Sequence, residues 1–380
     1  PKGYTPGNGS AAYTDPETGD VLWVVDATQE SGIDSYSFKN DLVKTQFSGT
    51  KTWEDYCTGF TPDFSGDSAP NIQLKLYRKA GESGVTEGVT YQQNGGQPTW
   101  SKGEDGTWTY TYMNLPKYDQ KGVEYIYWAL EEAGSVEGFY PAYPEGDTGN
   151  KIVNTATRFT LDKVCADAYD GEALNGVELT ITGEGGKTFA VWSRDEAGQV
   201  SSKVWRRGTD DVSQGGTEMT GDNAGWIIGL PAGGYTITET KTPTGHVTVE
   251  PIGLQISAEG VVALPASPSH AELVVEGANP GGTITIKVKD EVFRGHVNLK
   301  KTLDGSGGLE GVSFDLYRVG EPDVLIAKDI VTGADGTWKS VEADGIEVIP
   351  GGDEHHKTLA DGLHPGEYYF VETSAPDDVH

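Results

Sequence analysis

Alternating polar and apolar positions predict short β-strands along most of the chain. Residues 235–240 read Tyr-Thr-Ile-Thr-Glu-Thr, which places Tyr235, Ile237 and Glu239 on one face of an extended strand and three threonines on the other, because side chains alternate with a period of two. A carboxylate therefore takes the third place on a face that is otherwise apolar. A surface glutamate would belong with the threonines, so the pattern predicts that Glu239 points into the interior.

Two further segments end in the same way and predict a repeat. The runs YIYWALE at 125–131 and YYFVE at 368–372 carry aromatic residues on one face and finish with a glutamate on that face. All three runs follow a turn with a leucine and a proline, and a tryptophan lies upstream of each turn. Self-similarity of this kind is the signature of tandem modules. The three inward glutamates are Glu131, Glu239 and Glu372.

A strand upstream of each glutamate places a lysine among inward apolar residues. The three segments are FSGTKTW, FTLDKV and VNLKKT, and their lysines are Lys51, Lys163 and Lys301. The distances from lysine to glutamate are 80, 76 and 71 positions. Lysine and glutamate therefore recur together, each on a face that should be buried.

A third strand carries an asparagine or aspartate in phase with apolar residues. The three copies of this strand are SYSFKN, KIVNT and TITIKVKD, and their polar residues are Asn40, Asn154 and Asp290. Asn40 and Asn154 are 114 positions apart, against 112 for the first two lysines. Asn154 and Asp290 are 136 apart, against 138 for the next two lysines. The three features therefore share one repeat.

We expect an all-β tandem array that begins and ends within a module. Residues 1–40 would be the C-terminal part of a preceding module, and residues 41–155 and 156–290 would be two whole modules. Residues 291–380 would be a module without its last strand. Short strands joined by polar turns are typical of antiparallel β-sandwiches.

Composition and charge limit the function classes. A formal net charge of −30 argues against a nucleic-acid partner, and no apolar stretch is long enough to span a bilayer. The chain does not begin with Met, so we expect a fragment of a longer protein. Cys57 and Cys165 could form one disulfide or remain two thiols, and the sequence leaves this open.

No enzyme signature is present in the sequence. We find no nucleophile elbow, phosphate-binding loop or zinc-ligand spacing, so no cofactor and no metal site are expected. The pair His355-His356 lies in a stretch rich in Gly and Asp, which favours a solvated loop.

A lysine, a glutamate and an asparagine that are buried together allow two interpretations. One is a buried ion pair with an amide partner, because buried charges are normally paired. The other is covalent. Burial lowers the pKa of a lysine and raises that of a glutamate, a neutral lysine amine is a nucleophile, and a protonated glutamate can polarise a carbonyl and shuttle protons. The product would be an amide between side chains, with loss of ammonia from Asn or water from Asp.

At these residues the chain resembles the collagen-adhesin B-type repeat, also called the CnaB or SpaA-like domain, of Gram-positive surface adhesins and pilins. FSGTKTWED is similar to the first strand of the family, IVNT to its last strand, and YTITETKTPTGH to its Glu-containing strand, with His246 in place of a Tyr. The resemblance implies tandem immunoglobulin-like β-sandwiches in an elongated array, each with a self-formed Lys–Asn or Lys–Asp isopeptide bond.

The resemblance assigns the site residues one by one. Lys51 and Asn154 would be bonded with Glu131 as catalytic residue, and Lys163 and Asp290 would be bonded with Glu239 as catalytic residue. Lys301 and Glu372 have no acceptor in their module, and Asn40 has neither a lysine nor a glutamate, so these three are expected to stay unbonded within this chain. One hypothesis pairs the Asn40 strand of one molecule with module 291–380 of another.

The function implied is a structural stalk segment of an extracellular, cell-wall-anchored adhesin or pilin, with the anchor outside this sequence. Its partners would be neighbouring modules of the same chain. Apart from forming its own bonds once, it would not be an enzyme. The alternative is a region of such an adhesin that binds a host protein or a glycan through residues 193–223, where Trp205, Arg206 and Arg207 are typical interface residues.

Overall fold

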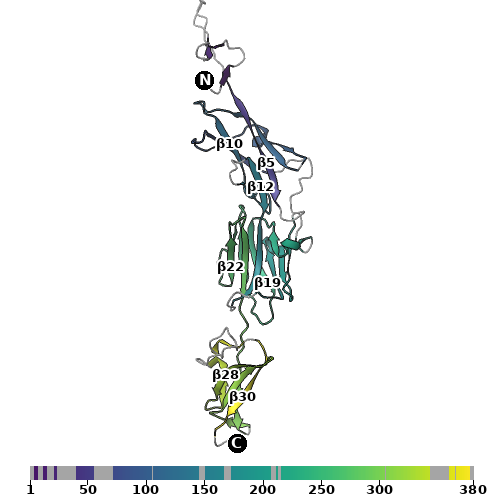
Figure 1. Ribbon diagram of the computed structural model, residues 1–380, viewed down its shortest axis with the longest axis vertical. Coiled ribbons are helices and arrows are strands. Elements are labelled where there is room, and N and C mark those ends of the chain that lie inside the picture. The colour runs from purple at the N-terminus through teal and green to yellow at the C-terminus, as the bar shows by residue number, and fades with distance from the viewer. Residues whose placement is uncertain are drawn as a thin grey trace, which may run out of the picture. The chain divides into compact units, whose positions relative to one another are not determined.

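The computed structural model describes most of the chain and consists of β-strands and short 3₁₀ segments, with no α-helix among the described residues (Figure 1). The described residues are 4–6, 12–14, 21–23, 40–54, 72–104, 106–144, 150–166, 173–206, 211–212, 215–303, 305–342, 359–363 and 365–376. No helical segment in this part of the chain is long and apolar enough to cross a membrane.

Near the N-terminus the structure has two small antiparallel pairs. β1 (Tyr4–Pro6) pairs with β4 (Asn40–Leu42), and β2 (Ala12–Thr14) pairs with β3 (Val21–Trp23).

Residues 41–155, called module one below, form two sheets. The larger sheet has the order β11–β12–β5–β9–β8, and the smaller sheet has the order β10–β6–β7. The bounds are β5 (Lys44–Glu54), β6 (Leu74–Ala80), β7 (Glu87–Gly88), η1 (Asn94–Gly96), β8 (Thr99–Lys102), β9 (Trp108–Pro116), β10 (Tyr125–Glu131), β11 (Phe139–Ala142) and β12 (Lys151–Ala156).

Residues 156–290, module two, also form two sheets. One has the order β18–β13–β23–β22 and the other β17–β16–β15–β14–β19–β20–β21. The bounds are β13 (Arg158–Cys165), β14 (Val177–Thr182), η2 (Glu184–Gly186), β15 (Thr188–Arg194), β16 (Val200–Val204), β17 (Thr217–Met219), η4 (Gly221–Asn223), β18 (Trp226–Ile228), β19 (Gly233–Lys241), β20 (Ile252–Ile256), β21 (Val262–Ala263), β22 (Ala271–Glu276) and β23 (Thr283–Asp290).

Residues 291–380, module three, contain one three-stranded sheet, β28–β27–β30, and the pairs β24–β29 and β25–β26. The bounds are β24 (Asn298–Lys300), β25 (Thr302–Leu303), β26 (Ser306–Gly308), β27 (Ser313–Arg318), β28 (Val324–Val331), β29 (Thr337–Lys339), η5 (Ser340–Glu342), η6 (Leu359–Asp361) and β30 (Tyr368–Ser374).

The period-two patterns of the sequence become buried faces in modules one and two. In β19, Tyr235, Ile237 and Glu239 are buried while the intervening threonines are not. In β23 the buried residues are Ile284, Ile286, Val288 and Asp290. Burial of the apolar members supplies the driving force that holds the polar members inside.

The first and last strands of modules one and two are neighbours and run parallel. β5 pairs with β12, and β13 pairs with β23, each in parallel register, whereas the other strand pairs of these modules are antiparallel among the described residues. The tandem β-sandwiches expected from the sequence are therefore confirmed, and their strand pairs are antiparallel except for these two. A parallel pair needs a long crossover between its strands, and here the rest of the module provides it.

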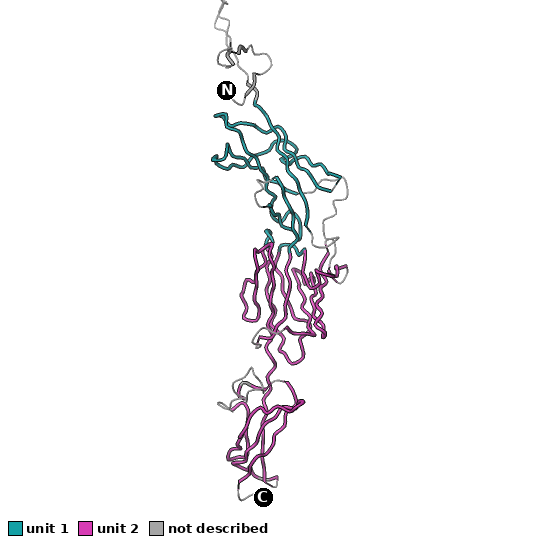
Figure 2. Tube along the Cα trace, in the orientation of Figure 1, with its two compact units in different colours: residues 1–157, 229–232, 257–260 teal, residues 158–228, 233–256, 261–380 magenta. Residues whose placement is uncertain are grey.

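The chain divides into two compact units, which Figure 2 distinguishes by colour. One unit comprises residues 1–157, 229–232 and 257–260, and the other comprises residues 158–228, 233–256 and 261–380. The finer division into the four segments 1–40, 41–155, 156–290 and 291–380 remains a prediction from the sequence repeat.

Candidate functional site

Module one brings its lysine, glutamate and asparagine together in the interior. Lys51 on β5 and Asn154 on β12 lie on neighbouring strands of one sheet, and Glu131 on β10 reaches them from the other sheet. Lys51 Nζ lies 2.8 Å from Glu131 Oε2. Asn154 Nδ2 donates a hydrogen bond of 2.9 Å to Glu131 Oε1. All three residues are buried, and Lys51 is 0% exposed.

Aromatic residues enclose this group. The Nζ of Lys51 lies 4.8 Å from the centroid of the Trp53 ring, and Trp53 packs edge-to-face on Phe139. Tyr110 packs directly over Gly49, where a Cβ atom would collide with its ring, so only glycine fits at this position of β5. The enclosure keeps water away from the amine, which strengthens every electrostatic interaction inside.

Burial changes the protonation chemistry of the lysine. Desolvation lowers the pKa of Lys51 to about 8, and the attraction of Glu131 opposes this shift without cancelling it. A neutral, nucleophilic amine is thus within reach near neutral pH. The Oδ1 atom of Asn154 has no hydrogen-bond partner among the described residues. A half-turn of the amide would place Oδ1 at the position of Nδ2, against Glu131 Oε1.

Module two repeats the arrangement with aspartate as the third member. Lys163 on β13 contacts Asp290 Oδ1 on β23 and lies 3.2 Å from Glu239 Oε1 on β19. Lys163 and Asp290 are both 0% exposed. Burial raises the pKa of Asp290 to about 7, with the nearby Lys163 opposing the shift. A buried carboxyl that is largely protonated below neutrality is a far better electrophile than a carboxylate.

Two contacts support the module-two site and were not anticipated from the sequence. The backbone N–H of Val249 donates to Glu239 Oε2 at 3.0 Å, which fixes the carboxylate. Arg194 donates to the carbonyl oxygen of Lys163 at 3.1 Å and to Asp162 Oδ1 at 2.8 Å. The Val249 contact could not be predicted because a backbone N–H is present in almost every residue type. The Arg194 contact could not be predicted because the position of Arg194 in the sequence does not indicate that it lies beside β13.

Module three contains the lysine and the glutamate, but no Asn or Asp acceptor lies beside them among its described residues. Lys301 Nζ lies 2.6 Å from Glu372 Oε2, but the two side chains are 33% and 37% exposed. Asn40 lies at the start of β4, and its side chain is outside the described residues. Among the described residues, the lysine and the glutamate of this module therefore form a partly solvent-exposed ion pair, whereas the corresponding groups of the other two modules are buried.

The structure corrects the expectation for residues 193–223. This segment contains β16, β17 and η4, and Trp205 is only 4% exposed because its ring packs on Phe189. Trp205 is thus a core residue and cannot serve as an exposed interface anchor. Arg206 is exposed, whereas Arg207 lies outside the described residues.

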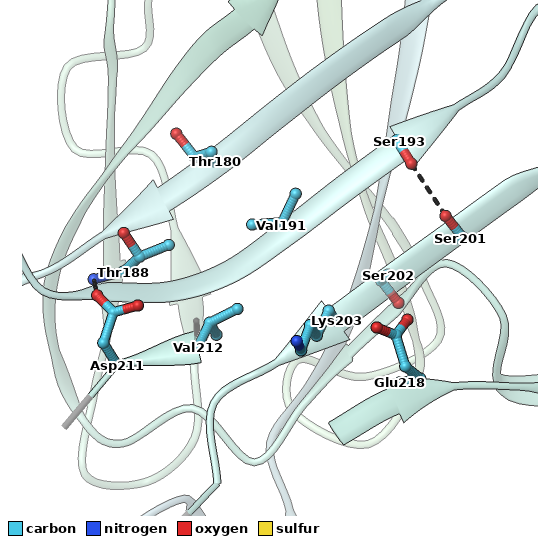
Figure 3. Close-up of a pocket in the computed structure, with 10 residues that line it drawn as sticks. All are labelled: Thr180, Thr188, Val191, Ser193, Ser201, Ser202, Lys203, Asp211, Val212 and Glu218. Atoms are coloured by element: carbon cyan, nitrogen blue, oxygen red, sulfur yellow. Dashed lines mark hydrogen bonds between the residues drawn. The ribbon is translucent and has the colours of Figure 1, made fainter. Parts of the chain in front are cut away.

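The outer face of the same sheet is hollowed. A hollow of about 460 Å³ lies over β14 to β17 and is lined mainly by hydroxyl and charged side chains (Figure 3). Ser193 and Ser201 are hydrogen-bonded across it at 2.9 Å, and Asp211 accepts from the backbone N–H of Thr188 at 3.0 Å.

The remaining candidates from the sequence lie apart from these groups. Cys165 is buried at the end of β13. Cys57, His355 and His356 are outside the described residues, so the structure does not address a disulfide to Cys57 or the environment of the two histidines.

Comparison with known proteins finds two related domains in tandem. The family model of the Cna protein B-type domain matches residues 47–155, and that of the SpaA prealbumin-like fold domain matches residues 157–267. No curated protein matches the chain.

Among solved structures, similarity is found to the Bacillus anthracis TIE protein, with 17% identity over 89% of this chain and 48% of that chain and a TM-score of 0.39. The pilus adhesin SpaC from Lactobacillus rhamnosus GG is similar at 15% identity over 98% of this chain and 40% of that chain, with a TM-score of 0.34. The B1 repeat unit of the collagen binding surface protein of Staphylococcus aureus is similar at 18% identity over 65% of this chain and 100% of that chain, with a TM-score of 0.17. This chain spans less than half the length of the first two proteins. The two family matches, which together cover more than half of this all-β chain, identify it as a tandem of Cna B-type and SpaA-like prealbumin-fold domains, which are domains of Gram-positive adhesins and pilins.

Proposed function

We propose that modules one and two each form one amide bond between side chains, and that the cross-linked modules serve as a structural stalk segment of a surface adhesin or pilin. The observation that carries this proposal is the meeting of lysine, glutamate and an Asn or Asp acceptor inside two successive sandwiches. A buried ion pair alone would need no third group, and it would often be no more stabilising than an apolar substitute.

The reaction in module one balances with no outside reagent. Transfer of one proton from Lys51 to Glu131 turns the ion pair into a neutral amine and a neutral acid, which burial favours. The amine attacks Cγ of Asn154 while Glu131 donates a hydrogen bond to the amide oxygen. Glu131 then delivers its proton to Nδ2 and takes one from Nζ. The Cγ–Nδ2 bond breaks, ammonia leaves, and a Lys51–Asn154 amide remains.

Module two would follow the same course with a different leaving group. The amine of Lys163 attacks Cγ of the protonated Asp290, Glu239 moves the protons, and water leaves as the C–O bond breaks. The contact between Lys163 and Asp290 in the structure supports this pairing. The raised pKa of Asp290 favours the protonated acid that the reaction needs.

The position of the bonds suits a load-bearing role. Because β5 and β12 are parallel neighbours, the chain enters module one at one end of this pair and leaves it at the other. A bond between Lys51 and Asn154 would carry a pulling force directly from strand to strand, so the sheet hydrogen bonds would be shielded. This supports an extracellular stalk in which neighbouring modules of the same chain are the principal partners.

The intact mass of the chain under reducing and denaturing conditions tests the proposal. We expect a mass below that of the sequence by one ammonia and one water. A Glu239→Ala variant should regain only the water, while the ammonia loss from module one persists. A mass equal to that of the sequence would overturn both bonds and leave two buried ion pairs.

A second candidate function is ligand binding by module two. It is favoured by the hollow over β14 to β17, whose hydroxyl groups and Lys203 could contact a glycan or a host protein (Figure 3). Replacing Lys203 with Glu and Ser201 with Tyr would block the hollow without touching the core. Binding to host glycans or matrix proteins that is unchanged in this double variant would exclude the hollow as the binding site.

A further inference from the structure

Module two contains two strands that have no counterpart among the described residues of modules one and three, and these strands build the hollow. Each module has one sheet that includes its glutamate strand, and the shared part of this sheet is β10–β6–β7 in module one, β19–β14–β15 in module two and β30–β27–β28 in module three. In module two, β16 and β17 extend the sheet beyond β15. The cross-link proposed for this module lies on β13, β19 and β23 and does not use them. The added strands are therefore available for a separate role.

The strand register places one row of side chains across the hollow, with one residue each from β14, β15, β16 and β17. Each member pairs with the next, and the row consists of Thr180, Val191, Lys203 and Glu218 (Figure 3). The neighbouring row places Ser193 opposite Ser201, and their hydroxyl groups are hydrogen-bonded at 2.9 Å. Because the side chains in the middle of both rows are short, they leave the sheet surface open between the longer residues at its rim.

The chemical groups of the hollow match those of a sugar ring. Val191 supplies a small apolar floor, and the residues lining the hollow around it carry hydroxyl, ammonium or carboxylate groups (Figure 3). Hydroxyl groups both donate and accept hydrogen bonds, an ammonium group only donates, and a carboxylate only accepts. A pyranose ring offers the complement, because its hydroxyl groups do both and its C–H face can cover Val191. The volume of about 460 Å³ lies within the roughly 300–1,000 Å³ of small-molecule sites.

The charges of the hollow disfavour an acidic ligand. Its charged lining residues are Lys203, Asp211 and Glu218, so one positive and two negative groups leave it negative, and the whole chain carries a formal charge of −30. Lys203 and Glu218 are cross-strand neighbours, yet no ion pair joins them among the described residues. Both groups are therefore available to a ligand. A sialylated or sulfated glycan would bring further negative charge into this field and would be repelled.

A protein partner fits the hollow less well than a sugar. Protein interfaces depend on buried anchors, most often Trp, Tyr or Arg, and the described lining of the hollow contains no aromatic residue and no arginine. Its apolar lining residues are Val191 and Val212, and Val212 is only 3% exposed. Trp205, which the sequence suggested as an anchor, is a core residue. The hollow therefore offers directional hydrogen bonds and little apolar surface.

We infer that the hollow binds the end of an uncharged glycan, with a hexose ring seated over Val191 and its hydroxyl groups bonded to Ser201, Lys203 and Glu218. The carboxylate of Glu218 accepts hydrogen bonds from sugar hydroxyl groups, and the ammonium of Lys203 donates to sugar oxygens. This inference rests on the second candidate function, ligand binding by module two, and narrows it to one class of ligand.

The test measures binding of the full chain, coupled to beads so that many weak sites act together, to immobilised oligosaccharides. The probes end in galactose, mannose or N-acetylglucosamine, and the galactose-terminated ones are also presented in sialylated and sulfated forms. We expect binding to at least one uncharged probe and at least tenfold weaker binding to the acidic forms. Binding to the acidic forms or to matrix proteins alone would overturn this ligand class and keep the second candidate function. Binding to none of them would overturn both.

Two variants place the binding in the hollow. Ser201→Tyr fills it and should abolish binding, whereas Thr240→Tyr changes an exposed hydroxyl residue on the same face of the sheet outside the hollow and should not. Glu218→Gln keeps the size of the side chain and should weaken binding roughly tenfold or more, the effect of losing hydrogen bonds to a charged group. Ser201 and Glu218 are exposed, so neither change should unfold module two. Unchanged binding in both variants would overturn the site. The intact mass of each variant reports the proposed cross-links separately.

Discussion

Lys51 pairs in register with Ile152, and Asn154 lies two positions further along the same parallel strand, beside Trp53. Lys163 and Asp290 show the same offset in module two, where Lys163 pairs with Val288. Residues two apart in a strand share a face, so the amine meets the acceptor diagonally while the glutamate approaches from the other sheet. The site is therefore fixed by strand register, and it tolerates different lengths of intervening chain.

Replacing one glutamate should disable one bond. In Glu131→Gln the side chain keeps its size but cannot shuttle a proton, so we expect bond formation in module one to slow by roughly 10²–10⁴-fold. The intact mass of freshly purified protein should then lack the ammonia loss and keep the water loss. Glu239→Gln is the matched control and should show the reverse. If the two variants and the parent chain show the same losses relative to the masses of their own sequences, the assigned roles are contradicted.

The two bonds should respond differently to pH. The neutral Lys51–Glu131 pair holds as many protons as the ion pair, so the loss of ammonia should change little with pH up to the Lys51 pKa of about 8 and should slow only above it. Asp290 has a pKa raised to about 7, so raising the pH above 7 removes the protonated acid and should slow the loss of water. Each effect approaches roughly tenfold per pH unit once the reactive form is the minor one.

Unbonded chain, recovered from inclusion bodies in denaturant, allows this comparison. It would be refolded by dilution at pH 6 and at pH 8.5, and the two mass losses would be followed over time. Parallel pH dependence of both losses would show that the Lys51 amine and the Asp290 carboxyl do not control the rates.

The backbone donor at Val249 should matter for module two alone. Proline at this position removes the N–H that holds Glu239 Oε2 at 3.0 Å. The carboxyl group then loses its fixed orientation, and we expect the water loss to slow by roughly tenfold, equivalent to about 1.4 kcal/mol or one ordinary hydrogen bond. Val249→Ala retains the N–H and is the control. A Val249→Pro protein that forms its bond as fast as Val249→Ala would show that this contact is dispensable.

The residues of the candidate sites could be predicted from the sequence because each one breaks a period-two apolar pattern, and because the breaks recur at matched spacing in three places. The parallel pairing of β5 with β12 could not be predicted, because alternation within one strand does not indicate which strand lies beside it or in which direction that strand runs. The expectation for Trp205 is wrong because a tryptophan in a polar stretch resembles an exposed anchor, whereas β15 and β16 fold it onto Phe189. The support from Val249 depends on loop conformation, which residue types do not specify.

Removing the acceptor of module one should lower its stability. Lys51 and Asn154 are 103 positions apart, and by the chain-entropy argument made for disulfides a cross-link closing such a loop stabilises by about 4–5 kcal/mol. Asn154→Ala keeps the Lys51–Glu131 pair and loses the bond, so its calorimetric transition for module one should fall to a lower temperature. Asn298→Ala, an exposed change on β24, should shift no transition. Equal thermograms for Asn154→Ala and the parent would contradict a cross-link in module one.

Mechanical extension provides the most direct test of the proposed cross-links. When the chain is pulled from its ends, force enters β5, crosses the Lys51–Asn154 bond and leaves through β12, so the intervening 103 positions should never extend. In Glu131→Gln that segment is free, and an unfolding event should appear with a contour gain of roughly 340–370 Å, at about 3.3–3.6 Å per residue. Glu239→Gln should instead release the 127 positions between Lys163 and Asp290, or roughly 420–460 Å. If the parent chain itself shows both gains, the strands are held by hydrogen bonds and ion pairs alone, and neither module can act as an inextensible link.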